Sequence, residues 1–185
     1  AHIETLTKKA AQQSLDLKDA TKAAGSQMMQ NRLYLSNYLL SGDTREVDRM
    51  NEGLRLLSQK LEEGQKMANS EQVKSALAKV QQLEQAWGKE FAQPLIEKRK
   101  DVDSGNATVA ELQIYYLQKD ASSWVKNSTD LLDGADAENN KLVDELPLVV
   151  GGALQRLRPS AHARFVRACR RPRRRSRSGS RRGRS

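Results

Sequence analysis

Apolar residues along the first 145 positions recur at alternating steps of three and four, which is the spacing of one face of an α-helix. In residues 3–40 this seam continues for five heptads. It consists of Ile3, Leu6, Ala10, Gln13, Leu17, Ala20, Ala24, Gln27, Asn31, Tyr34 and Tyr38. Similar seams occupy residues 44–68, 71–102 and 108–144, so the pattern predicts four long amphipathic helices.

Short breaks separate the predicted helices and carry turn and capping residues. Gly42 can end the first helix in a left-handed conformation, and Asp43 can cap the second. Thr108 and Glu111 form a capping-box pattern at the start of the fourth. Connections this short place consecutive helices antiparallel, so we predict an all-α fold, an antiparallel up-down-up-down four-helix bundle over residues 1–145.

Two of the predicted helices are irregular. Pro94 lacks a backbone donor and clashes with the preceding turn, so it should kink or loosen the third helix. Lys119, Ser123 and Asn127 interrupt the apolar stripe of the fourth helix, whose buried face should therefore be more polar than the others.

The charge of the chain changes abruptly near residue 146. Residues 1–145 contain 19 Lys and Arg against 23 Asp and Glu, a formal net charge of −4. Residues 146–185 contain 13 Arg, no Lys, no acidic residue and three of the four prolines. This composition predicts a disordered basic Arg-rich tail that follows a mildly acidic helical domain.

The tail allows three interpretations. Its guanidinium groups could neutralise nucleic-acid phosphates, or attract anionic lipid headgroups beside a membrane. We favour the third, a non-native sequence translated from a shifted reading frame, because Arg, Pro, Ser and Gly abruptly replace a bundle helix. The run from Leu146 to Leu154 is too short to span a bilayer, and the start at Ala1 suggests a processed segment or a fragment of a longer protein.

The sequence carries no pattern typical of a catalytic or metal site. His2 and His162 lie at opposite ends of the chain, and the single cysteine, Cys169, has no second cysteine with which to form a disulfide or a zinc site. Acidic clusters such as Glu62-Glu63 are typical of a solvated helix face. We therefore expect a protein that is not an enzyme and that has no cofactor and no metal ion.

One group of polar and aromatic residues is a candidate ligand-binding site. Tyrosines and a few cations between helices suit a small polar or anionic ligand. The candidates are Asn31, Arg32, Tyr34, Tyr38, Tyr115, Tyr116 and Lys119. Two structural interpretations compete with this site and are favoured: the tyrosines fill the core, and Gln13, Gln27 and Asn31 control the helix register.

The segment of residues 31–43 reads NRLYLSNYLLSGD. It is similar to the R-x-Y-L-L-T-G-D helix end in the extracytoplasmic four-helix-bundle sensor domain of bacterial methyl-accepting chemotaxis receptors. That domain is close to the CHASE-type sensors shared with histidine kinases. Residues 46–61 match it in length and pattern, as do residues 119–125 within the long final helix, and the resemblance covers about residues 1–145.

The resemblance implies a ligand-sensing input module, the periplasmic part of an inner-membrane receptor with one membrane helix before the bundle and one after it. The predicted bundle suits this topology, because both of its ends lie at one pole. The family implies a homodimer through the first helix, with a seam of Leu6, Ala10, Gln13, Leu17, Ala20 and Ala24. A small molecule or a ligand-loaded binding protein would bind near the far pole and displace the last helix slightly.

The segment after Asp144 departs from the family pattern, since arginines replace the expected membrane helix. The alternative function is an intracellular helical scaffold with an Arg-rich nucleic-acid-binding tail, although nucleic acid is not the partner we expect. The sequence identifies neither the ligand nor the output, which is chemotaxis signalling or a histidine kinase.

Overall fold

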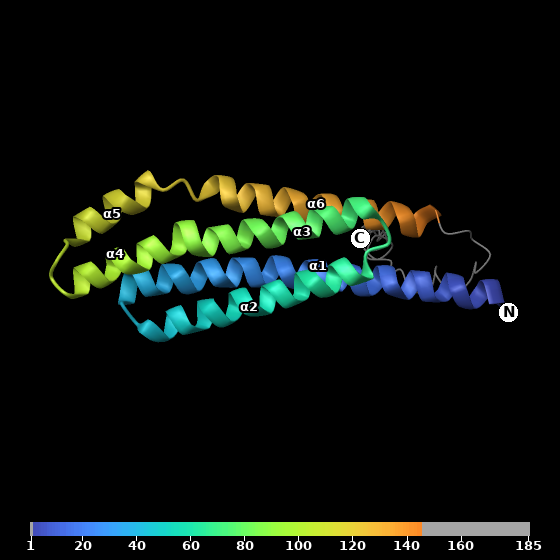
Figure 1. The fold of residues 1–185 in the computed structure, drawn as a ribbon, viewed down its shortest axis with the longest axis horizontal. Coiled ribbons are helices and arrows are strands. Elements are labelled where there is room, and N and C mark those ends of the chain that lie inside the picture. Colours follow the sequence, from blue (N-terminus) through green and yellow to red (C-terminus); the bar gives the residue numbers. More distant parts are fainter. Residues whose placement is uncertain (1, 146–185) are drawn as a thin grey trace, which may run out of the picture. The chain divides into compact units, whose positions relative to one another are not determined.

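The computed structural model describes residues 2–145, and every regular element in this range is helical, which confirms the all-α prediction. The predicted tail at residues 146–185 lies outside the described residues. The elements are α1 (His2–Ser41), α2 (Thr44–Met67), α3 (Glu71–Ala86), the π-helix η1 (Trp87–Ala92), α4 (Gln93–Asp103), α5 (Val109–Gln118) and α6 (Ser122–Glu145). Within this part of the chain, α1 packs along α2, α2 along α3, α3 along α6, and α6 along α1 (Figure 1).

The first two helices begin and end close to the predicted residues because capping groups stand at their ends. Gly42 has a φ of +72°, the left-handed conformation expected after a helix. The Asp43 side chain then accepts a hydrogen bond from the backbone N–H of Arg45 at 3.0 Å and caps α2. Ser70 caps α3 in the same way, by accepting from the N–H of Val73 at 3.1 Å.

The predicted loosening at Pro94 takes the form of a π-helix. The segments α3, η1 and α4 follow one another without a break, so one long helix runs through residues 71–103. At the end of η1 the N–H of Gln93 bonds to the carbonyl of Gly88, five residues back, as in a π-helix. The wider turn lies immediately before the proline, where a regular α-helical bond cannot form.

The prediction of one continuous helix over residues 108–144 is wrong. The chain forms α5 and α6 with a break at residues 119–121 between them. The N–H of Lys119 closes α5 on the carbonyl of Tyr116 at 3.2 Å, and Asp120 accepts from the N–H of Ser122 at 2.9 Å. Asp120 therefore acts as a local start signal for α6, as Asp43 does for α2.

The buried seam of α1 matches the predicted one at only four positions. Positions 17, 24, 31 and 38 are buried as expected. The other buried positions lie one residue later than predicted, and they are Ala11, Ser14, Thr21, Met28 and Leu35. The shift places the apolar Met28 and Leu35 inside and leaves Gln27 and Tyr34 at the edge of the packed face.

Two apolar clusters form the core. One contains Leu17, Ala24, Met28, Leu57, Leu61, Val73, Leu77, Val80, Leu132 and Ala135. The other contains Leu35, Tyr38, Met50, Trp87, Phe91, Ala92, Leu95, Ile96 and Leu112. Leucines, valines and small residues dominate the first cluster, whereas the large aromatic side chains gather in the second.

A group of polar side chains, here called the polar layer, lies between the two clusters and consists of Gln27, Asn31, Arg32 and Glu84. Arg32 Nη2 lies 2.8 Å from Glu84 Oε1, and Glu84 is only 2% exposed. Arg32 Nη1 donates to the carbonyl of Met28 at 2.9 Å, and its guanidinium carbon lies 5.3 Å from the centre of a Trp87 ring. Asn31 Oδ1 accepts from Gln27 Nε2 at 3.0 Å.

The polar layer has room for Asn31 because α2 carries a glycine opposite it. A Cβ placed on Gly53 would lie 1.9 Å from Asn31 Oδ1 and 2.7 Å from Gln27 Nε2. We expect Gly53→Ala to lower the free energy of unfolding by about 2 kcal/mol, since overpacking typically costs about 1–3 kcal/mol. Urea unfolding followed by circular dichroism at 222 nm would measure the change.

The matched control for this substitution is Gly134→Ala on α6. A Cβ at Gly134 would meet nothing within 4 Å, so alanine should stabilise the helix by about 0.5–1 kcal/mol. If both alanines shifted the midpoint in the same direction by similar amounts, close contact between Gly53 and Asn31 would not be the cause.

The cap of α2 predicts a pH dependence. Hydrogen bonds from Arg45 lower the pKa of Asp43 from 3.8 to about 2. The bond from the Arg45 side chain has the larger effect, and the bond from its backbone N–H the next. A depressed folded pKa means that the contribution of this carboxylate to stability is complete above its unfolded pKa and is lost as the pH falls towards the folded value. The stability difference between the unchanged chain and Asp43→Asn should therefore shrink between pH 4 and pH 2. Chemical unfolding at several pH values would reveal a constant difference if this cap were not involved.

Candidate functional site

The break between α5 and α6 borders a pocket of about 410 Å³. Its lining comes from the π-helix, the end of α5, the break and the start of α6. The residues are Glu90, Phe91, Tyr115, Gln118, Lys119, Asp120 and Trp124. Three aromatic side chains, the Lys119 ammonium and the acidic residues Glu90 and Asp120 thus meet beside the joint between two helices. The aromatic surface suits a small ligand with an apolar body.

Lys119 connects this pocket to the irregular part of the long helix. Its Nζ atom donates to the carbonyl oxygen of Glu90 at 3.1 Å. Glu90 is the residue four positions before Pro94, so in a regular α-helix its carbonyl would accept the N–H that proline lacks. The same ammonium lies 5.3 Å from the centre of the Tyr115 ring, in cation–π geometry. Lys119 therefore satisfies a carbonyl left without its usual donor and holds the break against the π-helix.

One carboxylate beside Lys119, that of Asp120, is fixed by local hydrogen bonds. Asp120 accepts from the side chain and the backbone of Ser122, and these bonds hold the pKa of its carboxyl below the usual value. It therefore remains negatively charged at neutral pH and is already engaged in starting α6. The Lys119 ammonium is left as the cation best placed to meet an anionic group in the pocket.

The structure brings together two of the seven predicted ligand-binding residues. Tyr115 and Lys119 both line the pocket. Tyr116 is next to them in sequence but is 42% exposed, with its ring 6.2 Å from that of Phe91 in an edge-on arrangement. Trp124 and Phe91 also line the pocket and were missed by sequence reasoning. Trp124 lies within residues 119–125, one of the segments similar to the sensor domain, and Phe91 lies on the apolar stripe of the third predicted helix.

The remaining candidates lie in the core. Asn31 and Arg32 belong to the polar layer, and Tyr34 is half-buried against the cluster of large aromatic side chains. Tyr38 is 1% exposed, and burial raises the pKa of its phenol. Its hydroxyl has no hydrogen-bond partner within the described part of the chain. The position of Tyr38 therefore fits the alternative interpretation, in which the tyrosines fill the core.

The predicted dimer seam is divided between the core and the surface of a single chain. Leu17 and Ala24 are fully buried inside their own chain, and Gln13 donates to the carbonyl of Met67 at 2.9 Å. Leu6 is more than half exposed, while Ala10 and Ala20 are partly buried. Leu17 and Ala24 have no surface left for a second copy while this packing holds.

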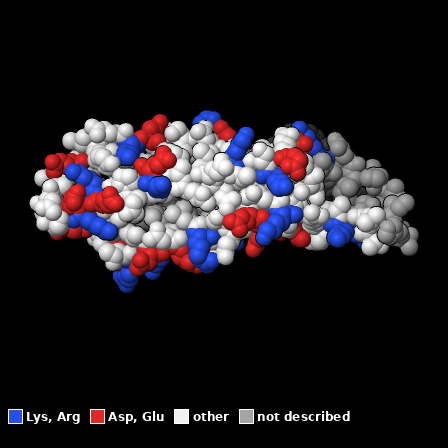
Figure 2. Space-filling view, in the orientation of Figure 1, with Lys and Arg blue, Asp and Glu red and all other residues white. Residues whose placement is uncertain are grey.

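The opposite face of α1 carries exposed apolar residues instead. Leu15, Met29, Leu33 and Leu40, here called the outer stripe, are all exposed. The spacings between them are sums of three- and four-residue steps. Such spacings place the four residues along one side of the helix, opposite the buried positions. Charged groups of both signs are interspersed over the molecular face seen in Figure 2.

The helices described here include none that is both long enough and apolar enough to cross a lipid bilayer. No family model matches the chain, and no curated protein or solved structure matches it either. The interpretation of function therefore depends on the pocket at Lys119, the faces of α1, and the resemblance carried by residues 31–43.

Proposed function

We propose that residues 1–145 are the ligand-sensing input module of a chemotaxis-type transmembrane receptor, an antiparallel four-helix bundle on the periplasmic side of an inner membrane. Membrane helices before and after the bundle are part of this proposal. The observation that carries it is the position of Lys119, which lines a pocket and at the same time ties the joint between two helices to the rest of the core.

The contacts between helices support the bundle. The chain of pairings from α1 to α2, α3, α6 and back to α1 closes on itself, with α4 and α5 extending it at one end. Polar bonds reinforce the closing pair, since Asn139 on α6 donates to the carbonyl of Ser14 on α1 at 2.9 Å. Such a ring has a single shared interior, which is what the resembling sensor domains require.

The pocket supports a small anionic ligand with an apolar body. Phe91, Tyr115 and Trp124 provide apolar surface, and Lys119 provides the positive charge. An anion that attracts the ammonium would compete with the Glu90 carbonyl and weaken the bond that holds the break. Ligand binding would thereby favour a second position of α6, the small helix displacement proposed as the signal.

The outer stripe of α1 supports a homodimer. Burying leucine and methionine side chains against their counterparts on a second copy removes apolar surface from water without disturbing the core. A ligand-loaded binding protein is a further partner in this proposal, and the exposed Val109, Ile114 and Leu117 of α5 would offer it an apolar surface.

Benzoate is a suitable probe of the pocket, because it combines a carboxylate with an apolar ring. It should quench or shift tryptophan fluorescence in a saturable way, since Trp124 lines the pocket. Lys119→Met should weaken its binding about tenfold or more, because a hydrogen bond to a charged group is lost. Lys126→Met, on the exposed side of α6, is the matched control and should bind normally. Equal binding of uncharged benzyl alcohol, or no loss in Lys119→Met, would contradict an anion site.

Light scattering of the full chain over a series of concentrations would test the homodimer. We expect a dimer whose dissociation constant rises at least about tenfold in Leu33→Glu, because a charge would have to be buried in the interface. Leu117→Glu, at a more exposed leucine position on α5, is the control and should leave the dimer intact. A strict monomer at high concentration, or equal effects of both substitutions, would count against a dimer through α1.

A further inference from the structure

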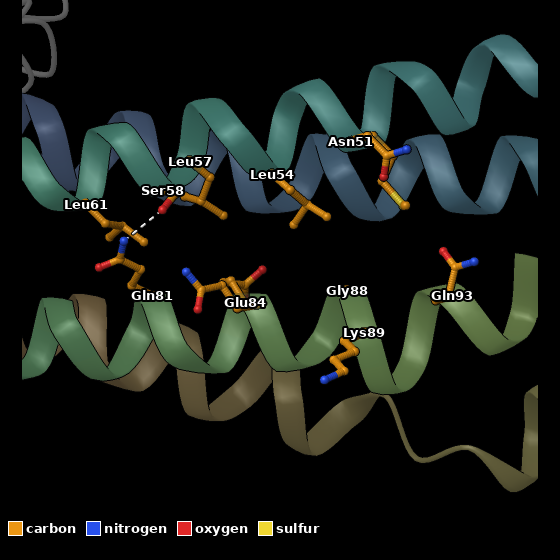
Figure 3. Close-up of a pocket in the computed structure, with 12 residues that line it drawn as sticks. Asn51, Leu54, Leu57, Ser58, Leu61, Gln81, Glu84, Gly88, Lys89 and Gln93 are labelled. Carbon is orange, nitrogen blue, oxygen red and sulfur yellow. Dashed lines mark hydrogen bonds between the residues drawn. The ribbon is translucent and has the colours of Figure 1, made fainter.

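A second cavity lies between α2 and the long helix formed by α3, η1 and α4 (Figure 3). Its volume is about 370 Å³, and it shares no lining residue with the pocket at Lys119. Leu54 and Leu57 form part of its apolar wall. Asn51 and Gln85 provide side-chain amides that make no hydrogen bond within the described part of the chain.

The second cavity is open along one side and is called the groove below. The carboxylate of Glu84 forms part of its wall. Its Oε1 atom is paired with Arg32, but its Oε2 atom is buried and has no hydrogen-bond partner within the described residues. A buried charged acceptor without a donor costs free energy, so a ligand that supplies an N–H group gains more here than at an exposed carboxylate. In Figure 3 the Glu84 side chain projects into the space between the two helices.

The charge balance of the groove favours a neutral ligand. Arg32 already compensates Glu84 at 2.8 Å, so an added ammonium would meet a guanidinium bound to the same carboxylate. Lys89 adds a further positive charge to the lining. An added carboxylate would face the free oxygen of Glu84. A primary amide avoids both conflicts, because its N–H₂ donates to Glu84 and its oxygen can accept from the amide of Asn51 or Gln85.

We propose that this groove is a second binding site, which takes a small neutral molecule with a primary amide on a short apolar chain. Gly88 contributes to the space available, since a Cβ at this position would lie 3.0 Å from Leu54 Cδ1. The site reaches the polar layer through Glu84 and Arg32, so its occupant contacts the group that links α3 to α1. The proposal does not depend on the function of the pocket at Lys119.

The test uses butyramide, with n-butylamine and n-butyrate as cationic and anionic probes of similar shape. Each is titrated into the ¹⁵N-labelled full chain while backbone amide signals are recorded by NMR. Butyramide should shift the signals of Leu54 and Gly88 in a saturable way, and bind at least about tenfold more tightly than either charged probe. Tighter binding of n-butylamine, equal binding of all three probes, or shifts confined to other residues would overturn the proposal.

Two substitutions test the roles of the unpaired Glu84 Oε2 atom and of the space beside Gly88. In Glu84→Gln the amide oxygen remains the acceptor for Arg32 and an N–H₂ group replaces Oε2, so butyramide binding should fall about tenfold or more. Glu63→Gln, on the exposed face of α2, is the matched control and should bind normally. Gly88→Ala narrows the groove without touching the carboxylate and should also weaken binding, which decides the question if Glu84→Gln does not fold. Unchanged affinity in folded Glu84→Gln or in Gly88→Ala would overturn the assignment.

Discussion

The ion pair between Arg32 and Glu84 constrains how the helices can pack. A carboxylate that is 2% exposed is tolerated only with a partner, since an unpaired buried charge costs several kcal/mol. This requirement allows α1 and α3 only the register that brings Arg32 to Glu84. Asn31, next to Arg32, enters the space that Gly53 leaves on α2, which sets the register of that helix as well. Two adjacent residues of α1 thus align three helices, and the apolar clusters pack on either side of them.

Sequence reasoning predicted the ends of most helices because the signals there are local. A glycine with positive φ and a capping Asp, Ser or Thr act within a few residues, as at Gly42 and Asp43. The phase of the buried face of α1 is not a local property. Ser14 and Thr21 are polar residues, so in the first half of α1 the pattern of apolar residues does not mark these positions as buried. Contacts with α2 and α6 decide it, including the bond from Asn139 to the carbonyl of Ser14.

The candidate site was predictable only in part, for a related reason. Tyr115 and Lys119 were identifiable as an aromatic and a cation close together in sequence. Their partners on the π-helix come from a segment about thirty residues earlier, so sequence spacing does not reveal the contact. Pro94 did indicate an irregular turn, but which donor would satisfy the Glu90 carbonyl depended on where the break before α6 fell. The Asp120 cap was the overlooked local signal, of the same kind as the cap at Asp43.

The arrangement of the polar layer determines which helix can move in the proposed sensor. Its side chains and the glycine that accommodates them belong to α1, α2 and α3, and none belongs to α6. A shift of α6 therefore leaves the buried ion pair intact, whereas a shift of α1 or α3 would separate two buried charges. The pocket at Lys119 lies at the start of α6, so an anion bound there would act on a helix that can shift without separating the buried ion pair. The outer stripe belongs to α1, which means that a dimer interface on this stripe would stay in place while α6 moves.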